Sequence, residues 1–361
     1  MKKTTTRTPF QNLRFLIFLN KVLALISCRL MNGRFKRSNA WSHYYCALWF
    51  LLHCAYSSVY YYTSCTALPT KKAEKGFVLS IVRFSAYFVS LLPYHAVAIL
   101  YEQDFIKLSD KLETYDDKAT ELGHPRKDHH VFIWLYFLYT FTTISIKAYY
   151  AISGSLEGGT SAIVVTLFEF VVPIVIGTYS VFLTGIFLDL IRQRFRHLNE
   201  AIVPRVSQLP ITGLRGVITL YDVRYLHSVL LDSAKLIDML YGIGTLIVFG
   251  SILLEFVSVI YMFITGVQDN AMVTMMDLLF QVIYLFAMYH FTTYEANRVE
   301  EGVARYGLSF QNAKSRLDKI EMMLYFYHKR FSFTAAEFFI LDLTILVSIA
   351  STVATYMTLI I

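Results

Sequence analysis

The sequence has little charge and little cysteine. Only 16% of its 361 residues are charged, and its four cysteines all lie in the first fifth of the chain. Their spacing predicts neither a disulfide framework nor a metal site. The sequence also lacks a nucleophile elbow and a Gly-rich phosphate loop, so we expect neither enzyme activity nor a cofactor.

Hydrophobic residues, by contrast, make up 56% of the chain, and the mean hydropathy is +0.48. This composition is too apolar for ordinary soluble domains. Several apolar runs exceed the roughly 18 residues that a helix needs to cross a bilayer. We therefore predict an all-α membrane protein with seven spanning helices. They are expected at 41–65, 77–101, 131–152, 162–190, 240–265, 271–295 and 338–361.

The predicted spans divide the chain into four parts. Residues 1–40 would form a cytoplasmic segment with an interfacial helix, and 41–295 a six-helix bundle that senses the ligand. Residues 296–337 would form a cytoplasmic anchor before a seventh helix at 338–361. Apolar residues at helical spacing also predict amphipathic inner helices at 102–124, 213–239 and 309–332.

The basic residues predict the orientation of the chain. Of its 33 Lys and Arg residues, 28 lie in the N-terminal segment and the loops on its side of the bilayer, and three lie on the other side. Because Lys and Arg concentrate in cytoplasmic loops, we expect the N terminus inside and the C terminus outside. The net charge of +7 is then a topology signal, and we expect a lipid bilayer and no nucleic acid as partner.

Five charged residues fall in the outer halves of the predicted second to sixth spans: Arg83, Lys147, Glu169, Glu255 and Asp277. Charges are costly in a bilayer and are a default functional hypothesis. At about 1.5 Å per residue, all five lie about 7 to 15 Å below the outer surface.

Polar and aromatic side chains accompany these charges at the same depth. Asp277, Gln281 and Tyr284 share one helical face, as do Glu255 and Ser258. We therefore predict an outward-facing pocket with aromatic walls. Its predicted ligand-binding residues are Arg83, Tyr87, Lys147, Tyr150, Glu169, Glu255, Ser258, Asp277, Gln281 and Tyr284.

A purely structural interpretation of the same charges is also open. Lys147 and Glu169 would pair with each other, and Arg83 would reach the lipid headgroups. Glu255 and Asp277 would bind backbone groups or water.

The last helix carries a stripe of small hydroxyl residues. They recur every three or four positions, which places them on one helical face. The stripe consists of Thr344, Ser348, Ser351, Thr352, Thr355 and Thr358. It fits either tight packing against another helix or a face turned to water in a pore.

Residues 333–361 resemble the C-terminal signature of insect gustatory receptors. The shared elements are Phe333-Thr334-Ala335, Leu341-Asp342, and Thr355-Tyr356 followed by five residues. The sequence departs from the signature at Glu337, where the family usually has Gly, and at Thr358 among the hydrophobic five. The signature normally closes with Gln-Phe, and the sequence ends just before it. We expect a channel without these two residues to be leaky or silent.

The resemblance implies a tastant-gated, non-selective cation channel in the plasma membrane of chemosensory neurons. It implies a homotetramer, or a heteromer with other gustatory receptors, and a pocket among the second to sixth helices of each subunit. The tastant would be a sugar or a bitter compound, with bitter slightly favoured, and monovalent and divalent cations would permeate. The seventh helix would line the pore through Ser348, Thr352, Thr355, Tyr356, Leu359 and Ile360. A secondary transporter of a small organic solute is the alternative, although the sequence shows no internal repeat.

Overall fold

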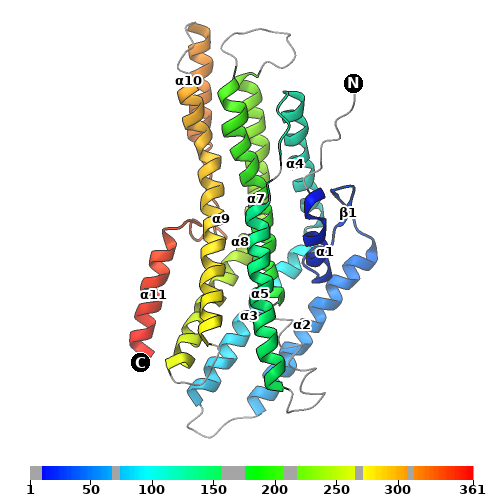
Figure 1. Cartoon of the computed structure of the whole chain (residues 1–361), viewed down its shortest axis with the longest axis vertical. Coiled ribbons are helices and arrows are strands. Elements are labelled where there is room, and N and C mark those ends of the chain that lie inside the picture. The colour runs from blue at the N-terminus through cyan, green and yellow to red at the C-terminus, as the bar shows by residue number, and fades with distance from the viewer. Residues whose placement is uncertain are drawn as a thin grey trace.

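The structure is a computed structural model that describes residues 10–66, 74–127, 129–155, 175–206, 218–264, 271–306 and 313–360. These residues form an elongated helical bundle (Figure 1). Its helices are α1 (Arg14–Val22), α2 (Ala40–Thr66), α3 (Glu74–Leu100), α4 (Glu102–Glu121), α5 (Val131–Ser155), α7 (Gly177–His197), α8 (Leu220–Ile264), α9 (Ala271–Tyr306), α10 (Ala313–His328) and α11 (Ile345–Ile360).

Three described helices are long and apolar enough to cross a bilayer by length and composition: Val131–Tyr150 in α5, Leu220–Tyr261 in α8 and Met272–Arg305 in α9. α8 has 45 residues and is therefore about 68 Å long, well beyond the roughly 30 Å of a hydrocarbon core. The predicted inner helix at 213–239 and the fifth span thus form one continuous helix over the described residues.

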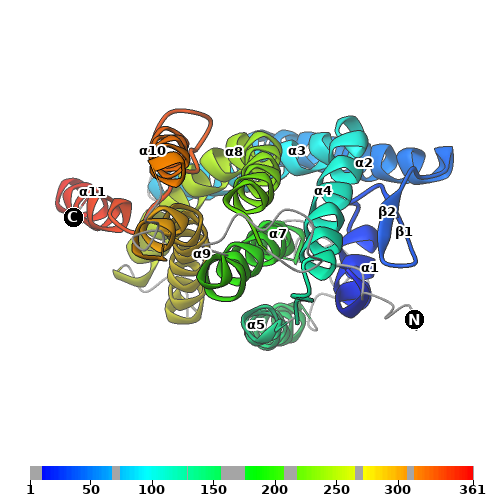
Figure 2. The same cartoon turned by 90° about the horizontal axis from the view of Figure 1, so that it is seen from above.

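α7 and α8 hold the bundle together. Nearly every residue of α7 is buried, as expected for a helix that is packed on all sides. Viewed from above, α7 lies near the middle, whereas α5 and α11 lie at the edge (Figure 2). α8 packs against α3, α4, α7, α9 and α11.

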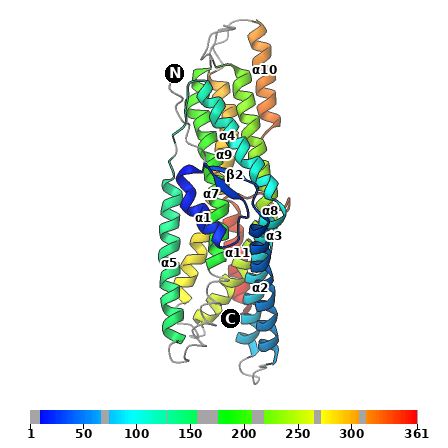
Figure 3. The same cartoon turned by 90° about the vertical axis from the view of Figure 1, so that its right-hand side faces the viewer.

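A second layer of helices occupies the upper half of the molecule. α4 and α10 lie there beside the extended ends of α7, α8 and α9 (Figures 1 and 3). Two turns of π- and 3₁₀-helix, Leu198–Ile202 and Val203–Arg205, extend α7 further in the same direction. Of these elements, α4, the first part of α8 and α10 coincide with the amphipathic helices that the sequence predicts, whereas 198–205 were not predicted.

A buried ion cluster joins α4 to α7 in this layer. Arg194 is fully buried and donates to Asp116 Oδ2 at 2.5 Å, while Arg126 donates to Asp116 Oδ1 at 3.1 Å. Burial opposes the ionisation of Asp116, but the charges and hydrogen bonds of Arg194 and Arg126 outweigh it and lower the pKa of this carboxyl. Tyr115 completes the cluster through hydrogen bonds to the Arg194 carbonyl and His197.

The N-terminal segment contains a β-hairpin that the all-helical prediction misses. Strands β1 (Arg29–Met31) and β2 (Arg34–Lys36) pair in antiparallel fashion. Asn32 and Gly33 join them with positive φ angles of 52° and 77°, the pattern of a two-residue Asn-Gly turn. Phe35 of β2 packs into the buried core beside Phe105 and Phe187.

The predicted start of the seventh helix is wrong. α11 begins at Ile345, not at Phe338, because the preceding residues fold into a compact turn. Ala336 and Glu337 adopt left-handed φ angles of 51° and 65°, which interrupt a right-handed helix. This backbone explains why a glycine would suit position 337. Asp342 then accepts hydrogen bonds from the amide and hydroxyl of Thr344, as helix-capping residues do.

Two side chains fasten this turn to the bundle. Asp238 of α8 accepts hydrogen bonds from the Thr334 amide at 2.9 Å and its hydroxyl at 3.2 Å. Asn297 of α9 both accepts from and donates to the backbone of Phe331. The chain that enters α11 is therefore held by α8 and α9 together.

We expect Asp116→Asn to destabilise the protein by about 3 kcal/mol at neutral pH, because it leaves the buried charges of Arg194 and Arg126 uncompensated. Since the folded pKa of Asp116 is lowered, its stabilisation is complete above the ordinary value and is lost as the pH falls below about 4. In thermal unfolding of detergent-purified protein, the difference in unfolding temperature between wild type and Asp116→Asn should become smaller in acid. Asp117→Asn, at the exposed neighbour, is the matched control. An equal effect of both substitutions would contradict the prediction.

Candidate functional site

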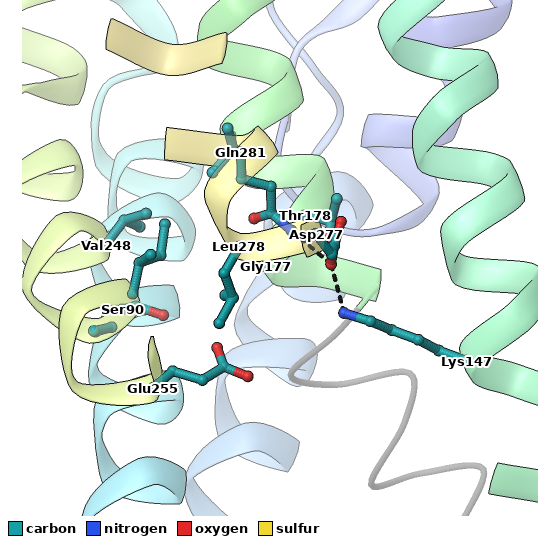
Figure 4. Close-up of a pocket in the computed structure, with 12 residues that line it drawn as sticks. Ser90, Lys147, Gly177, Thr178, Val248, Glu255, Asp277, Leu278 and Gln281 are labelled. Carbon is teal, nitrogen blue, oxygen red and sulfur yellow. Dashed lines mark hydrogen bonds and ion pairs between the residues drawn. The ribbon is translucent and has the colours of Figure 1, made fainter. Parts of the chain in front are cut away.

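Four of the charged and polar residues singled out in the sequence meet at one small cavity. Lys147 comes from α5, Glu255 from α8, and Asp277 and Gln281 from α9. Lys147 reaches toward Asp277, and Glu255 points into the same space from the opposite helix (Figure 4). Helices far apart in the sequence therefore contribute the charges of a single site.

An ion pair organises the cavity. Lys147 Nζ lies 2.5 Å from Asp277 Oδ2, and Gln281 Nε2 donates to the same oxygen at 3.0 Å. Both charged side chains are buried, with 9% of Lys147 and 2% of Asp277 exposed. Asp277 Oδ1 is also buried and has no hydrogen-bond partner in the described part of the chain. It is available to accept a hydrogen bond from water or from a ligand.

The structure identifies further lining residues that the search for charges missed. Ser90 of α3, Thr178 of α7 and Ser251 of α8 bring hydroxyl groups to the cavity. Ser251 lies one helical turn before Glu255, so helical spacing from the buried acid could have pointed to it. Neither Ser90 nor Thr178 has such a signal, because only the packing of α3 and α7 brings them here.

The cavity is small and is not aromatic. Its volume is about 30 Å³, room for little more than a water molecule. Besides the polar groups, its described lining consists of aliphatic side chains and a glycine. The expected aromatic walls are not found in this lining, and Tyr150 is 49% exposed on the bundle surface. A ligand larger than a few atoms could bind here only if the surrounding helices moved apart.

Of the remaining predicted pocket residues, some lie away from the cavity and the others are not among the residues that the structure describes. Ser258 is buried without lining the cavity, and Tyr284 stacks on Tyr136 with ring centroids 3.7 Å apart. Tyr284 also approaches Gly185 so closely that a Cβ there would lie 2.5 Å from its hydroxyl. The predicted residues outside the described part are Glu169 and the side chains of Arg83 and Tyr87.

The structure also gives a partner for one proposed structural ion pair. The structural interpretation pairs Lys147 with Glu169, which lies outside the described residues, and among the described residues the Lys147 ammonium group contacts Asp277. The pair joins α5 to α9 through two residues that are 130 positions apart in the chain. It gives α5, which stands at the edge of the bundle, a polar attachment to the interior.

The hydroxyl stripe of α11 lies on an exposed face. Ser348, Thr352 and Thr355 are exposed, which rules out packing of this face within the described part of the subunit. The Thr352 and Thr355 hydroxyls donate to backbone carbonyls one turn earlier, at 2.8 and 2.9 Å. The side chains of Tyr356, Leu359 and Ile360 lie outside the description.

Apolar helices too long for a soluble domain, a charged cavity between them, and a last helix at the edge of the bundle define a polytopic membrane protein. The chain belongs to the 7tm chemosensory receptor family, whose model matches residues 13–361. The family consists of receptors rather than enzymes. A search of curated protein sequences finds no match.

Two solved structures share the fold. The insect olfactory receptor OR5 from Machilis hrabei matches with a TM-score of 0.67 and 15% identity, over 98% of this chain and 99% of that one. The same receptor in complex with eugenol matches with a TM-score of 0.71 and 14% identity, over 97% and 98%. The predicted all-α fold with seven membrane helices is thereby confirmed.

We expect Lys147→Met and Asp277→Leu each to lower the stability by about 3 kcal/mol, because each leaves an unpaired charge in a buried site. The double variant should recover most of this loss, because both charges are then replaced by apolar groups. Thermal unfolding of the four purified proteins forms a double-mutant cycle. Lys235→Met, at an exposed lysine of α8, controls for the loss of a positive charge. Additive losses in the double variant would show that the pair makes no net interaction.

Proposed function

We propose that this chain is a gustatory-type receptor subunit that forms a tastant-gated, non-selective cation channel. The observation that carries this proposal is the exposed hydroxyl stripe of α11. Residues 333–361, which comprise this helix and the turn before it, resemble the gustatory receptor signature. An exposed polar face in a bilayer requires water or another protein surface. Four copies of α11 around an axis would supply both, as a homotetramer or with other gustatory receptors.

The proposed orientation puts the N terminus in the cytoplasm and the C terminus outside. It rests on the 28 basic residues on one side of the bundle against three on the other. In this orientation 1–40 and 296–337 are the cytoplasmic parts and 41–295 forms the sensing bundle. The cavity at Asp277 then lies in the outer half, facing a tastant that arrives at the plasma membrane of a chemosensory neuron.

The ligand proposed for this site is a small solute rich in hydrogen-bonding groups. The described lining offers Asp277, whose Oδ1 atom accepts no hydrogen bond from the described residues, and also a second acid, an amide and three hydroxyls. This described lining contains no aromatic ring. This chemistry supports a sugar or a small cationic bitter compound more than a broad aromatic bitter site. The complex of OR5 with eugenol supports the binding of a small molecule by a protein of this fold.

Gating follows from the small size of the cavity. At about 30 Å³ it admits a tastant only when helices separate, so the ligand stabilises the expanded state. α8 carries Glu255 at the cavity and Asp238 at the turn before α11, about 25 Å along the helix. α9 carries Asp277 and Asn297, about 30 Å apart. A tilt of either helix therefore displaces the entry to α11 and opens the pore.

We expect tastant-evoked cation current from cells that express this chain with Gln-Phe added after Ile361, and we expect cysteines on the hydroxyl face of α11 to control it. In a background without the native cysteines, Thr352→Cys and Thr355→Cys should react with a charged, water-soluble thiol reagent and lose most of the current. Ala350→Cys is the matched control, because it is exposed about 140 to 160° around the same helix. Block at Ala350 alone, or at none of the three despite evoked current, would exclude α11 as the pore lining. Solute uptake without current would favour the transporter.

We expect Asp238→Ala to separate ligand binding from gating, because it removes both side-chain hydrogen bonds to Thr334 while leaving the cavity unchanged. The current at saturating tastant should fall about fivefold or more, the range of typical coupling energies. Concentration–response currents and surface labelling measure this effect. Asp232→Ala, at an acid on the same helix paired with Lys111, should leave the current unchanged. Equal currents in both variants would refute coupling through this contact.

A further inference from the structure

A second and much larger cavity lies in the upper layer, at the opposite end of α7 from the charged site. It is bounded by the segment that joins α4 to α5 and by the last turns of α7. The chain passes here from α4 in the upper half to α5 in the lower half (Figure 3). Its volume is about 570 Å³, within the usual range of small-molecule sites. Neither the tastant site nor the pore uses it, and we call it the basic cavity.

The basic cavity is lined by far more positive than negative groups. Its cations are Arg126, Lys127, Arg192, Arg196 and Arg205. Among the described lining residues Glu200 is the one carboxylate, and it pairs with Arg196 at 3.0 Å. Asp116 and Asp189 lie behind the wall and pair with Arg126 and Arg192. Among the residues that the structure describes, five cations thus face three carboxylates even when these two acids are counted.

The histidines of the basic cavity lie near its cations but contribute no negative charge that would offset them. Arg205 donates to a ring nitrogen of His124 at 2.5 Å, so a cation is directed at an imidazole instead of an acid. Burial and the charge of Arg205 lower the pKa of His124. Burial and the charge of Arg126 lower the pKa of His197 to about 4. Neutral imidazoles still offer N–H donors, and a bound anion would relieve the repulsion that keeps them neutral.

We propose that the basic cavity binds a multiply charged phosphate group, carried either on the headgroup of a membrane lipid or on a free phosphate compound. Arginines in this number match the fork geometry and the charge of phosphate oxygens. Assignment to the cytoplasmic side rests on the orientation proposed above, whereas the binding chemistry does not.

The position of the basic cavity suits a lipid headgroup. Val131 and Phe132, the first residues of α5, line it and are 60% and 56% exposed. The Arg192 guanidinium lies 4.9 Å from the centre of the Phe132 ring. Exposed apolar side chains thus adjoin the cations where a membrane span begins, the arrangement that a headgroup and its acyl chains would meet. Contact with the segment that leads from α4 into α5 would let the bound anion stabilise this end of the bundle.

The test is binding to the purified full-length protein, without any measurement of current. One arm uses nanodiscs of phosphatidylcholine with and without phosphatidylinositol bisphosphate, and the other uses soluble inositol trisphosphate. We expect binding and a raised unfolding temperature at physiological salt in at least one arm. Arg196→Gln with Arg205→Gln should weaken binding by about tenfold or more, because two charge-assisted contacts are removed. Both arginines are exposed, so the variant should fold.

The matched control removes two cations from outside the basic cavity, with Lys107→Gln and Arg224→Gln in one variant. Both side chains are exposed, at 60% and 40%, and this variant should bind as wild type does. Binding in the nanodisc arm alone identifies a lipid, and binding in the soluble arm alone identifies a free phosphate. No binding in either arm, or equal weakening by the two double variants, would overturn the proposal. Because no arm depends on tastant or current, its outcome is independent of the proposed channel function.

Discussion

The interaction between Lys147 and Asp277 organises the part of the bundle that surrounds the small cavity. A lone charge is costly away from water, so each of these residues requires the other and Gln281 supports the pair. The contact attaches α5, an edge helix, to α9. It also leaves one Asp277 oxygen unpartnered in a cavity of about 30 Å³. A single ion pair thus fixes the packing of two helices and prepares an acceptor for a ligand.

The long helices α8 and α9 relate this cavity to the last helix. Each carries an acid of the cavity and, about 25 to 30 Å away, a side chain that holds the turn before α11. Asp238 and Asn297 provide these attachments by bonding to Thr334 and Phe331. Because each helix is continuous between these two points, a separation at the cavity would displace the turn. In the proposed channel, that displacement transmits ligand binding to the pore.

The sequence predicted the charged and polar groups of the site better than it predicted the apolar residues that line the cavity. Lys147, Glu255 and Asp277 stand out because a charge within an apolar run is conspicuous, and Gln281 shares a helical face with Asp277. The structure brings these four together. Aromatic residues are common throughout the helices, so depth alone could not tell which of them face inward. Tyr150 therefore proved to be exposed, while Tyr284 packs in an aromatic stack outside the cavity.

By itself the sequence determined the membrane class, the helix positions and the family, because hydropathy, length and a C-terminal signature are local properties. The predicted helix start at Phe338 is wrong because Ala336 and Glu337 adopt a left-handed backbone that neither residue type favours. The tertiary structure alone decided which charges pair, how small the cavity is, and that the hydroxyl face of α11 is exposed. It also gathered the dispersed arginines of two segments into the basic cavity. These features depend on how the helices pack, and the periodicity of one helix does not indicate which other helices lie beside it.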